Sequence, residues 1–266
     1  MSESPRWPPW YGPAALLLGL VTGAIGGVFA VLLIQGSAHS GTLTPTSTDV
    51  ATVIQDLGFV GAAVFLAAQA GHVTAAQFGL VTPRSLWRGV GYIVGAGIVF
   101  IVASEIYFSA LHSSGQEKEF VKEIGGGEGT LGVLAVCALT TVVAPICEEI
   151  LFRGFIFRSL SNWRGPWPAA VLTGILFGLV HGLSAPAVDL LPLALLGFLL
   201  CVIYHRSGSL YFCIAAHLIN NALALSGDLG WGVGRTVALL AGAAAVVSLA
   251  LAAVRLASNR WTPASD

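Results

Sequence analysis

The segment PAALLLGLVTGAIGGVFAVLLIQ, residues 13–35, contains no charged side chain. A helix that crosses the hydrocarbon core of a bilayer needs about 20 predominantly apolar residues, so this segment is long enough to span a membrane. It is also longer than the apolar part of a secretory signal, so we expect it to remain in the protein as a helix.

Seven further apolar segments follow it: residues 50–71, 89–111, 131–160, 167–183, 187–205, 208–226 and 233–255. Only 9% of the chain is charged and 56% is hydrophobic, whereas a soluble domain carries about 25% charged residues. The sequence therefore predicts an all-α, polytopic integral membrane protein with about eight transmembrane helices. We see no internal repeat, so residues 13–255 are expected to form a single membrane domain.

Positive charge is unevenly distributed between the predicted loops. One side of the membrane would hold eight arginines, and the other only three basic residues: Arg6, Arg84, Arg88, Arg158, Arg164, Arg206, Arg255 and Arg260 against Lys118, Lys122 and Arg235. Since the basic side faces the cytoplasm, residues 1–12 and the tail 256–266 are both predicted to be cytoplasmic in a multi-pass cell-membrane protein. The near-zero net charge argues against nucleic acid as a partner, and membrane lipids are the expected surroundings. The sequence does not fix the oligomeric state.

Small residues recur at helical spacing in two of the spans. Gly19, Gly23 and Gly27 lie in the first, and Gly91 and Gly95 lie in the third. Such spacing lets helices approach closely, and we expect packing within the chain rather than dimerisation. The loop HSSGQEKEFVKEIGGGEGT, residues 112–130, is long enough for a short external helix, and the four cysteines are expected to be core residues.

Ionisable groups inside the spans are few, and such groups are costly in hydrocarbon and often functional. They are Glu105, Glu148, Glu149, Arg153, His181, Asp189 and His217, with Asn220 and Asn221 as polar companions. Glu105 and Asp189 lie toward the outer ends of their spans and are expected to reach interfacial water. The stretch APICEEILFRGF, residues 144–155, concentrates three of the others.

Three of these groups lie at similar depth. Glu148, His181 and His217 stand 12, 13 and 9 residues from the predicted cytoplasmic ends of their helices, which corresponds to depths of roughly 14–20 Å. A shared depth on three separate helices predicts a buried polar chamber, which we expect to open toward the cytoplasm and lipid.

Helical spacing separates the roles within residues 144–155. Glu149 and Arg153 are four residues apart, so we expect an ion pair that serves a mostly structural role. Glu148 is rotated by about 100° from its neighbour and points elsewhere. Pro145 lies one turn earlier and cannot donate its amide, so a kink is expected beside the carboxylate.

The other two polar helices carry matching pairs. His217 and Asn221 share one helix face, as do Phe177 and His181. An imidazole beside an amide can stabilise developing negative charge, and a carboxylate opposite an imidazole can deprotonate water. No serine or cysteine occupies a matching position, so the pattern favours a hydrolase in which water is the nucleophile.

The motifs EEILFRG, FGLVH and HLINN, in this order, resemble those of the CPBP intramembrane proteases. This family is also called Abi and includes the type II CAAX prenyl endopeptidases. The signature region covers about residues 130–226. The resemblance implies that Glu148 activates water, His181 assists it, and His217 with Asn221 stabilises the oxyanion, while Glu149 and Arg153 are the accompanying ion pair. It also implies a peptide or lipidated protein as the substrate.

Three alternatives stay open at this point. Catalysis without a metal cofactor is favoured, but Glu148, His181 and His217 could instead hold zinc with an open fourth position. The chain could also be a non-catalytic bacteriocin-immunity or peptide-binding protein. A proton-coupled transporter is a third reading, against which stands the lack of an inverted repeat.

Overall fold

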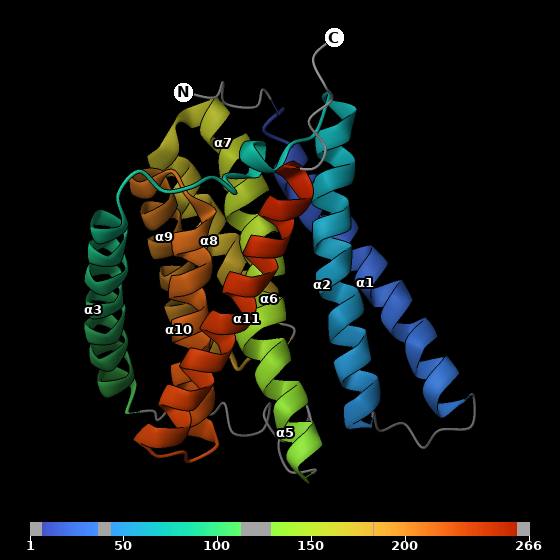
Figure 1. Ribbon diagram of the computed structural model, residues 1–266, viewed down its shortest axis with the longest axis vertical. Helices are drawn as coiled ribbons and strands as arrows, with labels where there is room; N and C mark the ends of the chain where they lie inside the picture. Colours follow the sequence, from blue (N-terminus) through green and yellow to red (C-terminus); the bar gives the residue numbers. More distant parts are fainter. Residues whose placement is uncertain (1–6, 37–43, 113–128, 183, 260–266) are drawn as a thin grey trace.

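The computed structural model describes residues 7–36, 44–112, 129–182 and 184–259, and these contain helices but no strand. The helices are α1 (Tyr11–Gln35), α2 (Pro45–Gln69), α3 (Leu86–Leu111), α5 (Gly129–Ala138), α6 (Ala144–Glu149), α7 (Phe157–Arg164), α8 (Pro166–His181), α9 (Leu190–Ser207), α10 (Leu210–Asp228) and α11 (Val233–Asn259), with short 3-10 turns at Ala75–Phe78 and Ala187–Asp189. The start of α1 and the end of α11 lie at the same end of the bundle (Figure 1). The predicted all-α fold is confirmed.

Six helical stretches among the described residues are long and apolar enough to cross a membrane. Two more apolar helices, Pro166–His181 and Val233–Leu249, are shorter. Each of the eight predicted segments therefore coincides with a helical stretch, and the count of eight spans is approximate. The expected external helix lies almost wholly outside the described residues.

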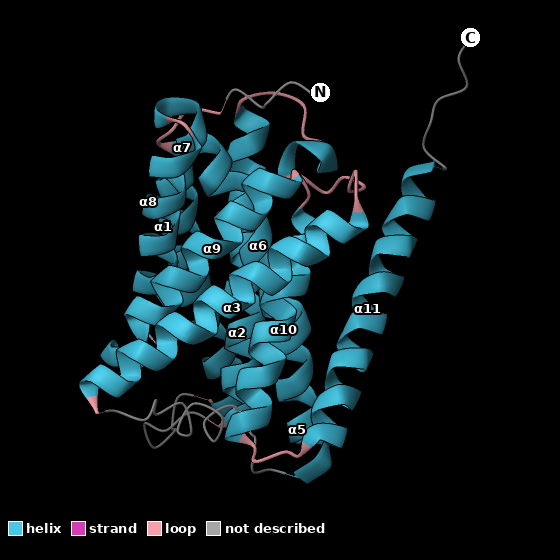
Figure 2. Ribbon diagram, turned by 90° about the vertical axis from the view of Figure 1, so that its left-hand side faces the viewer, coloured by secondary structure: helices cyan, strands magenta, loops and turns pink. Residues whose placement is uncertain are grey.

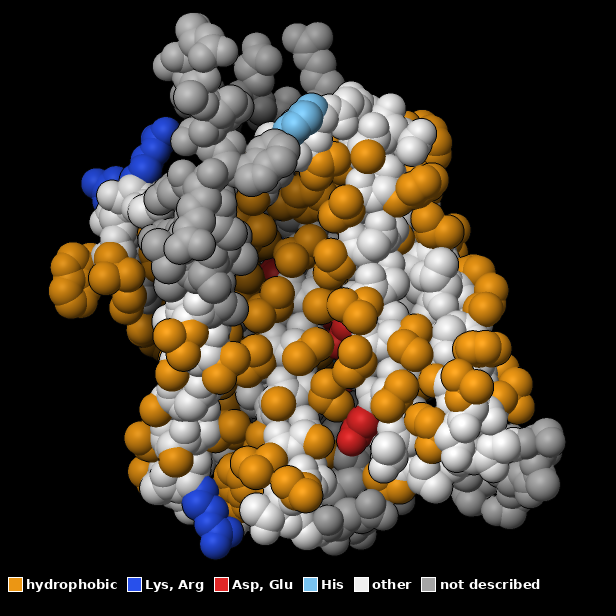
Figure 3. Space-filling view, turned by 45° about the vertical axis from the view of Figure 1, so that its right-hand side comes forward, with side chains coloured by type: hydrophobic (Ala, Val, Ile, Leu, Met, Phe, Trp, Pro, Cys, Tyr) orange, Lys and Arg blue, Asp and Glu red, His pale blue; other side chains and the backbone are white. Residues whose placement is uncertain are grey.

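Large apolar side chains cover the outside of the bundle. On α3 only Gly89 is buried, and α3 crosses the neighbouring helices obliquely (Figure 2). Leu33 on α1 and Ile106 on α3 are 71% and 66% exposed. One face of the molecule is largely hydrophobic, with lysine or arginine side chains toward its two ends (Figure 3). This is the surface expected of a protein surrounded by lipid.

Glycines set the contact between α1 and α2. A Cβ atom at Gly19 would collide with the Phe59 ring, and one at Gly23 would overlap the side chain of Gln55. The Gln55 amide donates to the Gly19 carbonyl over 3.0 Å. The prediction of packing within the chain is confirmed for the first span.

The prediction is wrong for the third span. A Cβ atom at Gly91 or Gly95 would meet no atom within 4 Å. Helix α3 instead makes its close approach at Gly89, where a Cβ atom would enter the ring of Phe212 on α10. The reading failed because helical spacing of small residues does not indicate which face the neighbouring helix covers.

The helix over residues 129–164 is not a continuous α-helix. Two π-helical stretches, Leu139–Val143 and Ile150–Ile156, interrupt it on either side of α6. Pro145 is the second residue after the first stretch, and the wider turn accommodates a residue that has no amide to donate. The expected kink beside Glu148 thus takes the form of π turns, which occur frequently at functional sites.

Helices α8 and α9 pack with their backbones close together. A Cβ atom at Gly174 would lie 2.7 Å from the Ala194 carbonyl oxygen, and one at Gly197 would lie 2.8 Å from the Phe177 Cβ atom. The side chains of Phe152 and Phe177 are fully buried beside this contact, with ring centroids 5.0 Å apart. This core holds the polar helices in register.

Candidate active site

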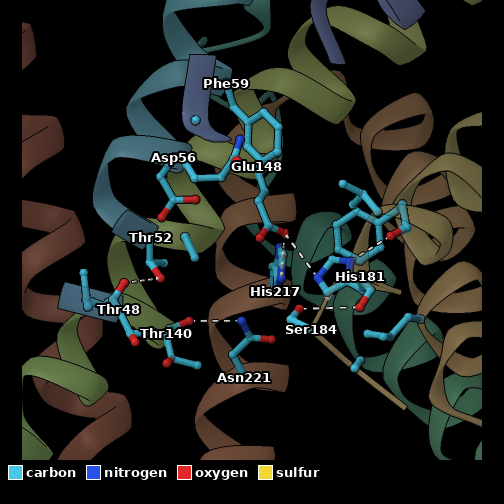
Figure 4. A pocket seen from close by; sticks show the side chains of 18 of the residues that line it. Thr48, Thr52, Asp56, Phe59, Thr140, Glu148, His181, Ser184, His217 and Asn221 are labelled. Atoms are coloured by element: carbon cyan, nitrogen blue, oxygen red, sulfur yellow. Dashed lines mark hydrogen bonds and ion pairs between the residues drawn. The ribbon is translucent and has the colours of Figure 1, made fainter. Parts of the chain in front are cut away.

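A cavity of about 530 Å³ lies between α1, α2, α8, α10 and the stretch that includes α6. Its lining is mostly apolar, but Glu148, His181, His217 and Asn221 all face it from different parts of the chain (Figure 4). The structure therefore brings together the four residues that the sequence indicated as catalytic. Their roles in a reaction stay predictions.

Glu148 lies between two imidazoles. Its Oε2 atom is 4.0 Å from Nε2 of His181 and 3.8 Å from Nε2 of His217. These separations are too long for direct hydrogen bonds, and Oε2 is a buried atom without a hydrogen-bond partner among the described residues. The side chain of Glu148 is 14% exposed. A carboxylate in this position has unused acceptor capacity beside two ring nitrogens.

The other nitrogen of each ring is occupied. Nδ1 of His181 lies 2.7 Å from the carbonyl oxygen of Phe177, and Nδ1 of His217 lies 2.8 Å from Oε1 of Glu149. Since both partners are acceptors, each Nδ1 carries a hydrogen and donates. In the neutral form, each Nε2 therefore presents a lone pair toward Glu148.

The predicted ion pair between Glu149 and Arg153 is present. Nη1 of Arg153 donates to Oε1 of Glu149 over 2.7 Å, and both side chains are fully buried. Nη2 of Arg153 donates to the Gly197 carbonyl over 3.0 Å, and the guanidinium lies 4.5 Å from the centre of the Phe177 ring. These contacts tie three helical segments together.

Glu149 does more than the sequence indicated. The same Oε1 atom accepts from Arg153 and from His217, so the ion pair also orients one of the imidazoles that face Glu148. The assignment of a mostly structural role to Glu149 was incomplete. No local signal could have shown this contact, because the two residues are 68 positions apart.

Asn221 lies one helical turn beyond His217 and donates from Nδ2 to the Thr140 carbonyl over 3.0 Å. Asn220 in turn donates to Oδ1 of Asn221 over 3.2 Å. Thr140 belongs to the first π-helical stretch, so that stretch fixes the orientation of Asn221. A primary amide carries two N–H groups, which leaves one for a group bound in the cavity.

The sequence of this region matches a known family. The model of the family described as type II CAAX prenyl endopeptidase Rce1-like matches residues 130–223, which contain all four cavity residues above. Residues 130–223 of this chain are similar to that family. The recognition of CPBP motifs from the sequence is thereby confirmed.

Individual relatives of the chain are distant. A Bacillus subtilis protein described as "Putative membrane peptidase YdiL" is 30% identical over 152 residues, which cover 53% of this chain and 60% of that protein. An Escherichia coli protein described only as an "Uncharacterized 24.3 kDa protein" is 29% identical over 52% of this chain and 63% of its own length. The chain thus spans less than two thirds of the length of these relatives. No solved structure matches it.

Phe177 is the packing centre of the candidate site. Its fully buried ring lies 4.6 Å from the ring of His181 and 5.6 Å from that of His217, measured between centroids. Its backbone carbonyl also accepts from His181. The sequence predicted that Phe177 and His181 share a face, and the structure adds the contact with His217.

Two acidic residues differ from expectation. Asp56 on α2 is 4% exposed and lines the cavity, although it was absent from the sequence-based set of polar residues. The signal was available, because Asp56 is an ionisable residue inside the second predicted span. Asp189 was expected in interfacial water but is also 4% exposed, because the 3-10 turn at Ala187–Asp189 folds it against the bundle.

The cavity opens away from the chain termini. Its lining includes Asp49 near the start of α2, Ser184 after α8 and Asp228 at the end of α10, and these positions lie at the end of the bundle opposite the start of α1 (Figure 1). His181 is itself the last residue of α8. The expectation of cytoplasmic termini and the expectation of a chamber open to the cytoplasm therefore exclude one another.

The donor set bears on metal binding. Among the described residues, no group of three histidine, cysteine, aspartate or glutamate side chains is spaced to hold a metal ion. Nitrogen and oxygen ligands around tetrahedral zinc lie about 3.3 Å apart, a little closer than the 3.8–4.0 Å between Glu148 and the two histidines. Catalysis without metal stays a prediction, with zinc as its alternative.

Proposed function

We propose that this protein is an intramembrane endopeptidase in which Glu148 activates water to hydrolyse a peptide bond. The observation that carries the proposal is the position of Glu148 Oε2, which faces two Nε2 atoms at about 4 Å in the wall of a largely apolar cavity. A cavity of about 530 Å³ is within the range that accommodates small ligands or a few residues of a peptide.

In the proposed reaction, Glu148 takes a proton from a water molecule in the cavity, and the resulting hydroxide attacks the carbonyl carbon of the substrate. His181 holds the water through its Nε2 lone pair. The C–N bond then breaks, and the proton held by Glu148 passes to the leaving amine. The products are a carboxylic acid and an amine, and the acid passes its proton to the amine to give a carboxylate and an ammonium group, so water is the only co-reactant.

His217 and Asn221 would stabilise the tetrahedral oxyanion. Asn221 donates from its second amide N–H, and His217 donates from Nε2 once that atom is protonated. The carboxylate of Glu149 holds this ring in position because it accepts from Nδ1. Glu149, Arg153 and Phe177 are positioning residues in this scheme.

We also propose that both termini are cytoplasmic. Among the described residues, Arg84, Arg88, Arg158, Arg164 and Arg206 lie at the terminal end of the bundle and only Arg235 lies at the other, as the positive-inside rule requires. The cavity then opens on the non-cytoplasmic side. Substrate would enter from that side or from the lipid.

Cysteine labelling tests the orientation. The four native cysteines are buried, so single cysteines can be read individually. Ser184→Cys at the cavity mouth should react with an impermeant maleimide in intact cells, whereas Trp163→Cys at the opposite end should react only after permeabilisation. The reverse pattern would place the termini outside.

A cleavage assay tests the proposed activity. Purified protein would be mixed with quenched peptides in detergent, one carrying a farnesylated CAAX terminus and one an internal membrane-proximal site. Cleavage of either by wild type, and of neither by Glu148→Gln, supports a peptidase. Peptide binding that is retained in both proteins without cleavage favours the non-catalytic peptide-binding alternative.

A further inference from the structure

Asp56 carries a buried acceptor that nothing in the described part of the chain satisfies. The residue is 4% exposed, and its Oδ2 atom is buried without a hydrogen-bond partner. It lines the same cavity as Glu148, and both side chains extend into that space from different helices (Figure 4). A buried carboxylate oxygen without a partner costs free energy, so a group bound in the cavity would be stabilised by contacting it.

Four carboxylates and two imidazoles line the cavity. Its acidic lining residues are Asp49, Asp56, Glu148 and Asp228, and the described lining contains no lysine or arginine. Acidic side chains are visible between hydrophobic ones on this face of the molecule (Figure 3). The buried pair of Glu149 and Arg153 is not part of this lining. Carboxylates in the wall of a largely apolar cavity favour cationic groups over anionic ones.

Helix α2 places a row of polar side chains along the cavity wall, from the mouth of the cavity inward. Thr48, Thr52 and Asp56 recur every four residues, so they lie on one helix face, and all three line the cavity. The Thr52 hydroxyl donates to the Thr48 carbonyl over 3.0 Å. A substrate side chain with hydrogen-bond donors therefore has a polar path from the mouth to Asp56.

We propose that Asp56 forms a binding site for a cationic side chain, lysine or arginine, of the peptide held in this cavity. The inference rests on the proposed peptidase function and refines its substrate class. The partner of Asp56 would be an ammonium or guanidinium group near the scissile bond, because Asp56 and Glu148 line one cavity. Charge-assisted hydrogen bonds of this kind are stronger than neutral ones.

The same charges disfavour a substrate that ends in a free carboxylate close to the scissile bond. A CAAX-type substrate carries its terminal carboxylate three residues beyond that bond, at most about 10 Å away in an extended chain. Such a carboxylate would lie in or near the acidic cavity with no described cation to receive it. Peptides with internal basic residues fit the site better.

The test uses a set of membrane-anchored peptides that differ at one residue. Lysine, norleucine or glutamate would be placed in turn at each of four neighbouring positions, because the register is not known. Binding would be measured to the full-length Glu148→Gln protein in nanodiscs by fluorescence anisotropy, and cleavage would be measured with wild type. Asp56→Asn, introduced into each background, removes the charge and keeps the shape, and Glu105→Gln on the exposed face of α3 is the matched control.

At one position, lysine should bind about tenfold or more tightly than norleucine, and glutamate should bind most weakly. Asp56→Asn should remove this preference, Asp56→Lys should favour glutamate, and Glu105→Gln should leave the preference unchanged. Equal binding of lysine and norleucine at all four positions, or no binding of any peptide, would overturn the cation site. So would a lysine preference that survives in folded Asp56→Asn.

The two proposals fail separately in this design. A lysine preference in binding without cleavage of any peptide supports the cation site and contradicts the peptidase. Cleavage by wild type without a lysine preference supports the peptidase and contradicts the cation site.

Discussion

Replacing Arg153 by alanine should destabilise the protein far more than replacing an arginine a little over one turn later. Arg153 is fully buried, pairs with fully buried Glu149 at 2.7 Å, and donates to the Gly197 carbonyl. Its loss leaves a buried carboxylate without its cation and a carbonyl without its donor. Removing one partner of a buried ion pair costs about 3–5 kcal/mol.

Arg158→Ala is the matched control. Arg158 is partly exposed, and it donates a hydrogen bond of 2.8 Å to the Tyr204 hydroxyl. The expected cost is about 1 kcal/mol, since a single hydrogen bond contributes about that much net. For a chain of this size, each kcal/mol of lost stability lowers the midpoint temperature of thermal unfolding by roughly 2–4 °C. This midpoint should therefore fall by roughly 6–20 °C for Arg153→Ala and by only a few degrees for Arg158→Ala.

The assay heats purified protein to a series of temperatures. Size-exclusion chromatography then measures the fraction that remains monodisperse at each temperature. A double variant, Glu149→Gln with Arg153→Met, should lose less stability than the two single variants summed, because it leaves no unpaired buried charge. If Arg153→Ala unfolds at the same temperature as Arg158→Ala, the ion pair does not stabilise the helix that carries Glu148.

Two further substitutions separate chemistry from packing. His217→Ala should keep a folded yield well above that of Arg153→Ala, because Glu149 retains its arginine, while turnover should fall by about 100-fold or more; equal losses of yield in the two variants would undo this division. Gly197→Ala should lower the thermal midpoint by an amount equivalent to about 1–3 kcal/mol, because the new methyl would press on Phe177 and Gly174. Gly91→Ala, where the methyl meets no atom within 4 Å, should leave the midpoint within a degree or two of wild type, and a larger fall there would contradict the packing described.

The fold followed closely from the sequence because hydrocarbon imposes a simple rule. Each apolar segment of sufficient length became a helix, and the spacing of Glu149 and Arg153 gave their ion pair. Pro145 indicated a break in the helix, but its π-helical form was not predicted, nor was the second π-helical stretch, in which Gly154 packs against Phe78. The close approach of α3 at Gly89 rather than Gly91 also depended on a neighbour, Phe212, far along the chain.

The sequence predicted which residues form the candidate site but not how these residues hydrogen-bond to one another. Depth in the membrane grouped Glu148, His181 and His217, yet the bond from His217 to Glu149 arises only when α10 packs against α6. The end at which the cavity opens also escaped prediction. The predicted depths were distances from the helix ends on the side of the chain termini. His181 is the last residue of α8, so it lies close to the opposite end of the bundle.

Hydrolysis by Glu148-activated water is tested most directly by the rate of peptide cleavage in matched carboxylate variants. Wild type, Glu148→Gln and Glu105→Gln would be compared on the best-cleaved peptide, each with and without a strong zinc chelator. The proposal predicts that Glu148→Gln is folded but slower by about 100-fold or more, that Glu105→Gln matches wild type, and that the chelator changes nothing. Undiminished cleavage by Glu148→Gln would contradict it, and loss with chelator that zinc restores would replace it with a metal-dependent mechanism.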